Sequence, residues 1–355
     1  MKKIVLTGGG TAGHVTPNIA LLPALRQAGY EISYMGSYDG IEKRLIADFD
    51  IPYTGISTGK LRRYLDIRNL TDPFRVIKGF SEARKYLKSY RPDVVFSKGG
   101  FVSVPVVRAA AALGIPCILH ESDMTPGLAN RLCFPVAKKI CCNFPETMQM
   151  LPEGKAVLTG SPIRSELAQG NRIAGLDLCG FTANRPVILV IGGSLGAANV
   201  NKAVRDALPR LLEDFQVVHL CGKDKIDNLL LTTSGYKQFE YVKTELKDLF
   251  AMADIVISRA GANSICELLA LKKPNVLIPL PAASSRGDQL LNAASFEAQG
   301  FSLVINEDDL TTELLVAKVH ELFSNRQSYH DAMGRSGQMD SVHTILRLIE
   351  EAAQT

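Results

Sequence analysis

The chain has 355 residues, of which 46% are hydrophobic and 21% are charged, and its net charge is +4. This composition is typical of a soluble globular protein, and the length favours two domains over one. No apolar run approaches the roughly 20 residues of a membrane-spanning helix. Two lysines followed by three apolar residues at the start do not make a signal peptide. Seven cysteines without a Cys-x-x-Cys spacing predict reduced thiols and a cytoplasmic chain.

Short apolar strands alternate with amphipathic helices along the whole chain. This alternation predicts α/β domains with parallel sheets that helices cover on both faces. The expected strands lie near 3–7, 31–36, 93–97, 116–120, 139–143, 156–159, 186–191, 216–220, 238–241, 254–258, 275–279 and 302–305. The expected helices lie near 17–28, 42–49, 73–90, 103–113, 126–134, 199–213, 245–252, 263–271, 288–298, 311–324 and 340–353.

A turn at 160–162 divides this pattern into two halves. We expect a first domain at 1–162 and a second at 163–339, with a final helix in 340–355 that packs back on the first. Each half contains a strand, a glycine turn and a helix start, which attracts anions such as phosphate. The two junctions predict a cleft between two doubly wound domains, with an anionic ligand held in it.

The first junction, GGGTAG at 8–13, follows the first expected strand. Its glycines can bind phosphate or can simply let a helix pack closely. The segment fits the G-x-G-x-x-G pattern of dinucleotide sites. Such sites also have an acidic residue at the tip of the second strand, but here Asp39 lies beyond that tip. A nicotinamide oxidoreductase is therefore disfavoured. His14 follows directly, where a neutral imidazole can accept a proton from an attacking hydroxyl or brace the loop.

The helix expected at 73–90 mixes cations with large apolar residues. One face of it can rest on an anionic membrane surface, although core packing produces the same pattern. Nucleic-acid binding is disfavoured because no recognition motif accompanies the charge. The candidate membrane residues are Phe74, Arg75, Ile77, Lys78 and Phe80.

Polar residues at 120–123 (HESD) follow another strand of the first half. They suit acceptor binding or proton transfer, since open parallel sheets bind ligands at the carboxyl ends of their strands. A solvated loop is the simpler interpretation. Asp48 and Asp50 match the D-x-D pattern of metal-dependent nucleotide-sugar enzymes, but they fall at a helix end. We expect no metal role for them, and no Cys/His cluster has zinc spacing.

Two glycine junctions follow in the second half, at 192–197 (GGSLGA) and 258–267 (SRAGANSICE). The former lacks the Gly-Lys-Ser/Thr ending of a P-loop, so nucleoside triphosphate hydrolysis is not expected. In the latter, Glu267 can accept both hydroxyls of a ribose or merely complement the helix dipole. Asp288 and Gln289 follow a later strand and can reach sugar hydroxyls, or simply begin a helix.

Together these segments resemble the MurG family of UDP-N-acetylglucosamine transferases nearly from end to end. The resemblance implies a GT-B fold, with two Rossmann-like domains facing across a cleft, and an inverting reaction without metal or other cofactor. It also implies peripheral attachment to the inner face of the cell membrane. The segments that carry it are GGGTAGHV at 8–15, KGG at 98–100, HE at 120–121, PG at 126–127, GGS at 192–194 and SRAG at 258–261.

The implied reaction moves N-acetylglucosamine from UDP-N-acetylglucosamine to the C4 hydroxyl of a lipid-linked muramoyl-pentapeptide, which converts lipid I to lipid II in peptidoglycan and cell-wall biosynthesis. His14 is the first choice for the base, with Glu121 or Asp123 as alternatives. Position by position, the resemblance implies phosphate contacts from Ser194 to Asn201, uracil contacts at Arg164 and Val242, a ribose contact at Glu267, and sugar contacts at Asp288 and Gln289. The remaining substrate residues are Thr11, Ala12, Gly13, Asp123, Ala262, Asn263, Ser264 and Ile265.

The chain departs from many members of that family at two places. Phe101 stands where they have Tyr, and Ser122 and Asp123 stand where they have Gln and Asn. Asp123 adds a negative charge near an anionic donor, so it can serve as a base rather than as a sugar contact. The alternatives are a glycosyltransferase with another acceptor, a sugar-nucleotide epimerase, a nicotinamide oxidoreductase, and a non-catalytic nucleotide-sugar or membrane-binding module.

Overall fold

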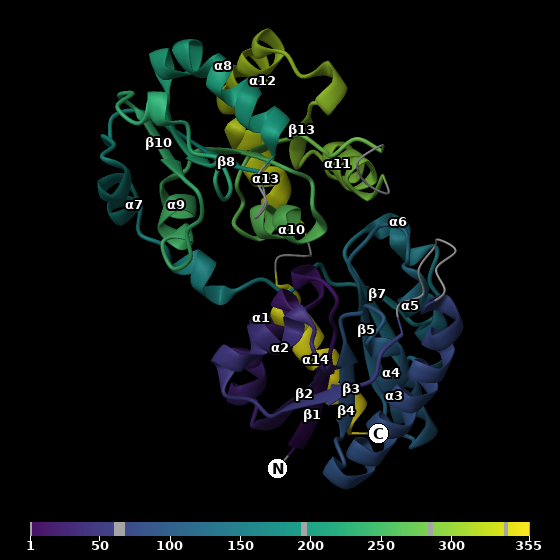
Figure 1. The fold of residues 1–355 in the computed structure, drawn as a ribbon. Coiled ribbons are helices and arrows are strands. Elements are labelled where there is room, and N and C mark those ends of the chain that lie inside the picture. The colour runs from purple at the N-terminus through teal and green to yellow at the C-terminus, as the bar shows by residue number, and fades with distance from the viewer. Residues whose placement is uncertain (1, 60–67, 193–196, 283–286, 337–339, 355) are drawn as a thin grey trace. The chain divides into compact units, whose positions relative to one another are not determined.

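The computed structural model describes the whole chain except residues 1, 60–67, 193–196, 283–286, 337–339 and 355. The chain divides into two compact units (Figure 1). The first comprises Met1–Arg164 with Asp340–Thr355, and the second comprises Ser165–Met339. The division falls within a few residues of the expected one, and it assigns Arg164 to the first unit rather than the second.

The first unit contains a parallel seven-stranded sheet with the order β3-β2-β1-β4-β5-β6-β7. The order reverses between β1 and β4, and ligands bind at such a switch point in open α/β sheets. The central strands β1, β4 and β5 are mostly buried because helices cover both sides of the sheet. The strands are β1 (Lys2–Thr7), β2 (Tyr30–Ser37), β3 (Tyr53–Ile56), β4 (Val94–Ser97), β5 (Cys117–Glu121), β6 (Lys139–Cys142) and β7 (Ala156–Leu158).

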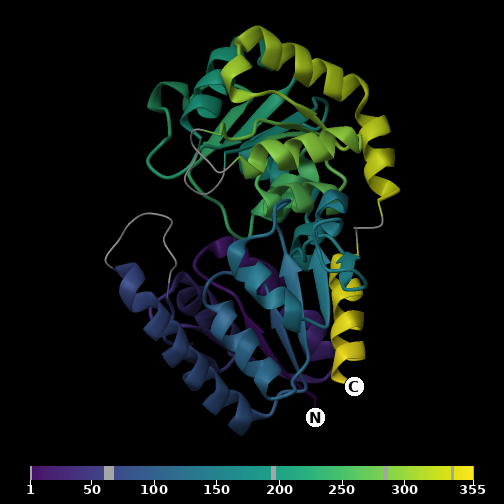
Figure 2. The same cartoon turned by 90° about the vertical axis from the view of Figure 1, so that its right-hand side faces the viewer.

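Two buried clusters cover the faces of this sheet. Helices α1 and α14 supply one, with Leu21, Leu25, Ile345 and Ile349 among its members. Helices α3 and α4 supply the other. The last helix thus packs within the first unit (Figure 2). The helices are η1 (Ala12–His14), α1 (Thr16–Gln27), α2 (Ile41–Ile46), η2 (Ala47–Phe49), α3 (Arg68–Tyr90), α4 (Ser103–Ala112), α5 (Leu128–Cys133), η3 (Phe134–Val136), α6 (Pro145–Met148) and α14 (Ser341–Ala353).

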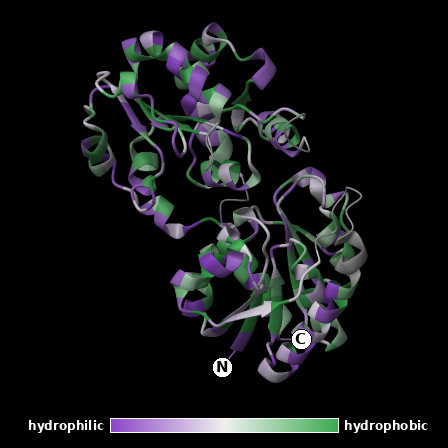
Figure 3. Cartoon of the chain, viewed as in Figure 1, coloured by the Kyte–Doolittle hydropathy of each residue, from purple (hydrophilic) through white to green (hydrophobic). Residues whose placement is uncertain are grey.

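The second unit repeats this design with a parallel six-stranded sheet of order β10-β9-β8-β11-β12-β13. Its switch point lies between β8 and β11. Hydrophobic residues concentrate along the central strands of both sheets (Figure 3). The strands are β8 (Val187–Ile191), β9 (Gln216–Leu220), β10 (Tyr236–Phe239), β11 (Ile255–Ser258), β12 (Asn275–Leu277) and β13 (Ser302–Val304).

Helices α8 and α12 pack over one face of this sheet in a single buried cluster. Each helix presents one apolar stripe, in which residues about one turn apart fall on the same side. The helices are η4 (Ser165–Gln169), α7 (Arg172–Cys179), α8 (Ala198–Asp214), η5 (Asn228–Leu230), α9 (Leu246–Met252), α10 (Ala262–Ala270), α11 (Asp288–Ala298), η6 (Glu307–Asp309), α12 (Thr312–Ser324) and α13 (Arg326–Gly334).

Among the described strands and α-helices, β3, α6, α7 and α13 were not expected from the sequence. Helix α7 nevertheless carries clear local signals. The Asn171 side chain caps its first N–H groups, and Gly180 ends it with a φ of 69°. No helix in the described part of the chain is both long and apolar enough to cross a bilayer. All seven cysteines are buried free thiols.

Candidate active site on the two units

The glycine loop of the first unit follows β1 at the switch point of the sheet. The N–H of Gly9 faces the carbonyl of Gly99 at 3.4 Å. A side chain at Gly100 would place its Cβ 2.3 Å from the Gly9 carbonyl oxygen, and Gly100 has a φ of 85°. Only glycine combines this backbone conformation with such a close approach. The KGG segment therefore serves as the support on which the first glycine loop rests.

Glu42 on α2 supports the loop from its other side and was not predicted from the sequence. Its carboxylate is fully buried, and Oε2 accepts the N–H of Gly10 at 3.1 Å. Oε1 accepts the N–H of Ser37 at 2.9 Å. The N–H groups of Gly9 and Gly10, which the sequence pattern offered to phosphate, are thus used within the unit. A buried carboxylate beneath the loop also disfavours a second anion there.

His14 ends this loop on η1, and its imidazole is half-buried. Nδ1 lies 3.0 Å from the Gly9 carbonyl oxygen and 3.2 Å from Oγ1 of Thr11. Because a carbonyl only accepts, Nδ1 carries the proton and Nε2 is the free acceptor. Burial, assisted by the charge of Lys98, lowers the pKa of His14 to about 4. At neutral pH the ring is therefore uncharged, in the tautomer that a general base requires.

The other predicted residues of this loop, Thr11 and Ala12, are exposed, and Gly13 is half-buried.

Glu121 stands at the end of β5 and holds the following loop, residues 122–127. Its Oε1 accepts the N–H of Asp123 at 3.0 Å, and its Oε2 accepts the N–H of Gly127 at 3.0 Å and Nδ2 of Asn130 at 2.9 Å. Burial raises the pKa of Glu121. With both oxygens engaged, this carboxyl is arranged to position the loop, whereas Asp123 is half-buried on the loop itself.

Two further contacts fasten this loop to the end of β6 and to α6. Nδ2 of Asn143 donates to the carbonyl of Ser122 at 3.1 Å, and Oγ1 of Thr147 donates to the carbonyl of Met124 at 2.8 Å. The loop is therefore fixed at its start, middle and end by side chains from three elements. We call residues 122–127 the acceptor-side loop below.

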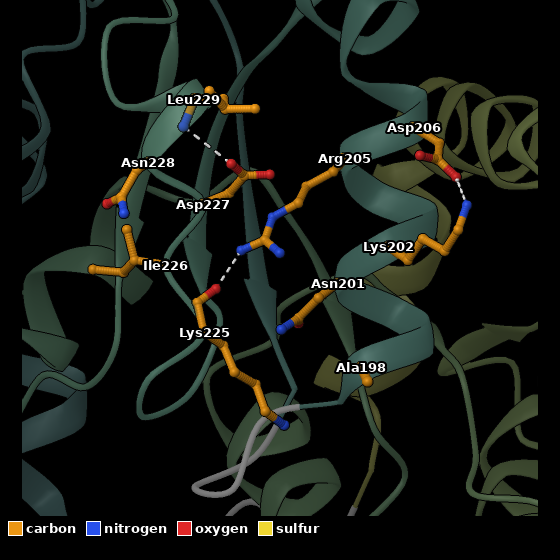
Figure 4. A pocket seen from close by; sticks show the side chains of 10 residues that line it. All are labelled: Ala198, Asn201, Lys202, Arg205, Asp206, Lys225, Ile226, Asp227, Asn228 and Leu229. Carbon is orange, nitrogen blue, oxygen red and sulfur yellow. Dashed lines mark hydrogen bonds and ion pairs between the residues drawn. The ribbon is translucent and has the colours of Figure 1, made fainter.

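In the second unit, Ser194 lies outside the described residues. Asn201 on α8 is buried, with Nδ2 donating to the Cys221 carbonyl at 2.7 Å and Oδ1 accepting from Nε2 of His219 at 3.0 Å. Its amide is thus used inside the unit rather than offered to a phosphate. Asn201 also borders a pocket of about 710 Å³ between α8 and the segment 225–229 (Figure 4). Among the residues lining this pocket, Ala198 and Asn201 fall within the predicted phosphate-binding stretch, and the others were not predicted.

The junction after β11 has a different construction. Gly261 precedes α10 and has no side chain to cap the first N–H groups of the helix. Residues 262–264 are half-buried, Ile265 is buried in the core, and Glu267 lies half-buried in the next turn. The start of α10 thus has no side-chain cap, and helix starts of this kind attract anions.

Arg259 lies beneath this junction and was not assigned a role from the sequence. Its guanidinium is buried, and Nη1 donates to the carbonyls of Ile278 at 3.0 Å and Pro279 at 3.3 Å. It also pairs with Glu307 on η6. These contacts hold the carboxyl ends of β11 and β12 in a fixed arrangement.

The remaining predicted donor residues are dispersed. Gln289 is half-buried near the start of α11, and its Oε1 accepts the N–H of Leu280 at 3.1 Å. Asp288 is half-buried beside it. Val242 is buried in the second unit after β10, whereas Arg164 is half-buried at the end of the first. Within the described part of the chain, no three histidine, cysteine or acidic side chains gather as metal ligands would.

The predicted membrane residues lie on α3. The side chains of Phe74 and Ile77 are 74% and 63% exposed, which is unusual for large apolar groups. Arg75 and Lys78 are exposed beside them. Phe80 is instead half-buried and packs against the core of the first unit, so the exposed apolar surface is made by Phe74 and Ile77.

Two doubly wound parallel-sheet units in one chain, each with a glycine junction at its switch point, define the GT-B class of glycosyltransferases. Comparison with known proteins agrees. The family model for the glycosyltransferase family 28 N-terminal domain matches residues 4–142, and the model for the C-terminal domain matches residues 187–346. The chain therefore belongs to glycosyltransferase family 28 and, within it, to the MurG family.

Relatives match over nearly the whole chain. Proteins of Lachnospira eligens and Lachnoclostridium phytofermentans are 64% and 65% identical over 351 residues, which is 99% of both chains in each case. Both are named UDP-N-acetylglucosamine--N-acetylmuramyl-(pentapeptide) pyrophosphoryl-undecaprenol N-acetylglucosamine transferase. The crystal structure of MurG from Acinetobacter baumannii matches with a TM-score of 0.79 at 28% identity, covering 99% of this chain and 100% of that one.

Proposed function

We propose that the protein transfers N-acetylglucosamine from UDP-N-acetylglucosamine to N-acetylmuramyl-(pentapeptide) pyrophosphoryl-undecaprenol, the lipid I to lipid II step of peptidoglycan synthesis. The observation that carries this proposal is identity of 64–65% over 99% of the chain to enzymes of that name. The site supports it, because a neutral histidine and a helix start suited to anions occupy the ligand-binding edges of the two units.

The reaction is a direct displacement in this proposal. The C4 hydroxyl of the muramoyl sugar attacks C1 of N-acetylglucosamine while its proton passes to Nε2 of His14. The bond between C1 and the UDP oxygen breaks, UDP leaves with the electron pair, and the configuration at C1 inverts. A base placed in this way typically contributes about 10²- to 10⁴-fold.

The acceptor-side loop would present the muramoyl sugar to His14. Support comes from the way Glu121, Asn143 and Thr147 hold this loop from separate elements. Asp123, which this loop carries, is the alternative base, whereas Glu121 acts through the loop as a positioning residue.

The donor would bind at the carboxyl edge of the second sheet. The N–H groups at the start of α10 would meet the diphosphate and stabilise the charge that develops on the departing UDP. Glu267 would accept the ribose hydroxyls, and Asp288 and Gln289 would read the sugar. Arg164 and Val242 would flank the uracil.

Peripheral attachment to an anionic membrane surface, at the inner face of the cell membrane, completes the proposal. It is supported by Phe74 and Ile77, which expose apolar surface on α3, and by the exposed cations Arg75 and Lys78 next to them in the sequence. Such an arrangement combines apolar insertion with attraction to anionic headgroups.

The test is a transfer assay with labelled UDP-N-acetylglucosamine and the lipid-linked muramoyl-pentapeptide, run with and without a chelator. We expect a labelled lipid-linked disaccharide and UDP in equal amounts under both conditions. Label recovered only as free sugar, or as an epimerised nucleotide sugar, would reject the proposed transfer.

A further inference from the structure

Lys98 is a buried cation that the mechanism above does not use. It follows β4 directly, its side chain is 1% exposed, and its backbone N–H donates to the Thr7 carbonyl of β1 at 2.9 Å. Its Nζ donates to Nδ1 of His120 at 2.7 Å and also to Oγ of Ser122. One side chain thus joins the end of β4, the end of β5 and the start of the acceptor-side loop.

The tautomer of His120 fits its contact with Lys98. Nε2 of His120 donates to the Gly160 carbonyl at 2.9 Å, so its Nδ1 is left as an acceptor for the lysine. Burial, with the charge of Lys98, lowers the pKa of His120 far below its usual value, so the ring is neutral. Burying an ammonium group is costly, and its position here is tied to the orientation of His120 and Ser122.

The side chain of Lys98 also begins next to the glycine loop. A Cβ on Gly8 would stand 3.1 Å from Cβ of Lys98, which shows how closely the loop passes over it. Lys98 is also the charge whose field opposes protonation of His14. It therefore lies between the loop that carries the base and the loop that faces the acceptor.

We propose that Lys98 is a positioning residue for the transfer reaction: through His120 and Ser122 it sets the acceptor-side loop, and it places a fixed positive charge beneath the loop that carries His14. This inference rests on the proposed function and adds a residue to it. Lys98 acts through its neighbours and does not touch the reacting atoms.

The charge has a consequence for the pH dependence of the reaction. The groups that face His14 are the Gly9 carbonyl and the Thr11 hydroxyl from its own loop, Glu42 from α2, and Lys98 from the end of β4. Glu42 raises the pKa of His14, whereas Lys98 lowers it. An enzyme with a neutral base loses activity as the pH falls through the pKa of that base, and this fall is the acid limb of its pH profile. Removing Lys98 raises the pKa of His14, so the acid limb moves to higher pH.

The test measures the pH profile of kcat/KM and the KM of the acceptor in matched variants. Lys98→Gln removes the charge but keeps an amide that can donate to His120, and Lys98→Arg keeps the charge. Lys139→Gln is the control, because Lys139 begins β6, at the other end of the strand from the acceptor-side loop, and its ammonium donates to the Gly154 carbonyl at 2.9 Å. We expect Lys98→Gln to move the acid limb up by about one pH unit and to raise the acceptor KM, with the limb unmoved in the other two.

A lower rate in Lys98→Gln with an unchanged limb and an unchanged acceptor KM would overturn the inference and leave Lys98 a merely structural residue. If circular dichroism shows that Lys98→Gln does not fold, Ser122→Ala decides instead. It keeps the charge and removes one contact to the loop, so we expect a higher acceptor KM with an unchanged donor KM. An unchanged acceptor KM in Ser122→Ala would reject the role of Lys98 in setting the loop.

Failure of the proposed function is recognised separately. In that case the unmodified protein gives no lipid-linked disaccharide at any pH. An unmodified protein that transfers the sugar normally, alongside variants that behave like it, rejects the inference about Lys98 alone.

Discussion

The glycine junctions after β1 and after β11 look alike in the sequence but form different sites. After β1, Gly10 gives its N–H to the buried Glu42, and the group left facing outward is the imidazole of His14. After β11, Gly261 leads into α10 with residues 262–264 half-buried. In the proposed function, the first junction supplies the base and the second binds the diphosphate. The strand–glycine–helix pattern does not reveal that a buried carboxylate accepts the N–H of Gly10, whereas no side chain caps the start of α10.

The largest effect is expected at the base. His14→Ala removes the group that accepts the acceptor's proton, so kcat should fall by about 10²- to 10⁴-fold. The steady-state rate of lipid-linked disaccharide formation measures it, with His343→Ala, an exposed histidine on α14, as the control. An undiminished kcat in His14→Ala would shift the role of base to Asp123.

A smaller effect is expected at the donor side. Glu267→Ala removes the carboxylate that would hold the ribose, and hydrogen bonds to a charged group are worth about 1.5–3 kcal/mol. The KM for UDP-N-acetylglucosamine should rise by about ten- to a hundredfold while kcat changes little. A loss confined to kcat would contradict the ribose assignment.

Glu42→Gln tests whether the first junction depends on its buried carboxylate. In this variant an NH₂ group replaces one carboxylate oxygen and faces the N–H of Gly10 or Ser37. Two donors then meet and one hydrogen bond is lost, which lowers the free energy of unfolding by about 1–3 kcal/mol. We expect lower stability in urea denaturation and a kcat reduced by about tenfold, with an unchanged donor KM. Glu153→Gln, at an exposed position, is the matched control. A donor KM raised in step with the loss of kcat would show that this loop binds the donor.

The smallest effect on the chemistry itself is expected from the membrane surface. Replacing Phe74 and Ile77 by Ser removes two exposed apolar groups, each worth about 1.5–3 kcal/mol when fully buried. Sedimentation with anionic vesicles should show weaker binding, whereas kcat with a water-soluble acceptor analogue should be unchanged. Leu229→Ser, at an exposed position of the second unit, is the control. Vesicle binding that survives the double change would place the membrane contact elsewhere.

Much of the fold could be predicted because buried parallel strands are short apolar runs between amphipathic helices. Strand β3 was missed because its four residues are mostly half-buried and include Gly55, which weakens the apolar signal. Asn201 shows a signal that was present but unused. Val204, Leu208 and Leu211 are buried on the same helix at spacings of three, seven and ten residues from it, which places Asn201 on the inward stripe.

The supporting residues of the site could not be predicted in this way. Glu42 contacts Gly10 across 32 positions of the chain, and Lys98 contacts His120 across 22. No periodic pattern in the sequence indicates either pair, because the order of the strands in the sheet brings these residues together. His14 and Glu121 were singled out from the sequence because Glu121 ends β5 and His14 ends the glycine loop after β1, at the strand ends where ligands bind, and their roles stay predictions.

The division of roles between the two junctions is tested most directly by the affinity for UDP, measured by titration calorimetry on the unmodified protein, His14→Ala and Glu267→Ala. If the first unit supplies the base and the second holds the nucleotide, His14→Ala should bind UDP as the unmodified protein does, and Glu267→Ala should bind it about tenfold or more weakly. Weakened UDP binding in His14→Ala, together with unchanged binding in Glu267→Ala, would contradict this assignment.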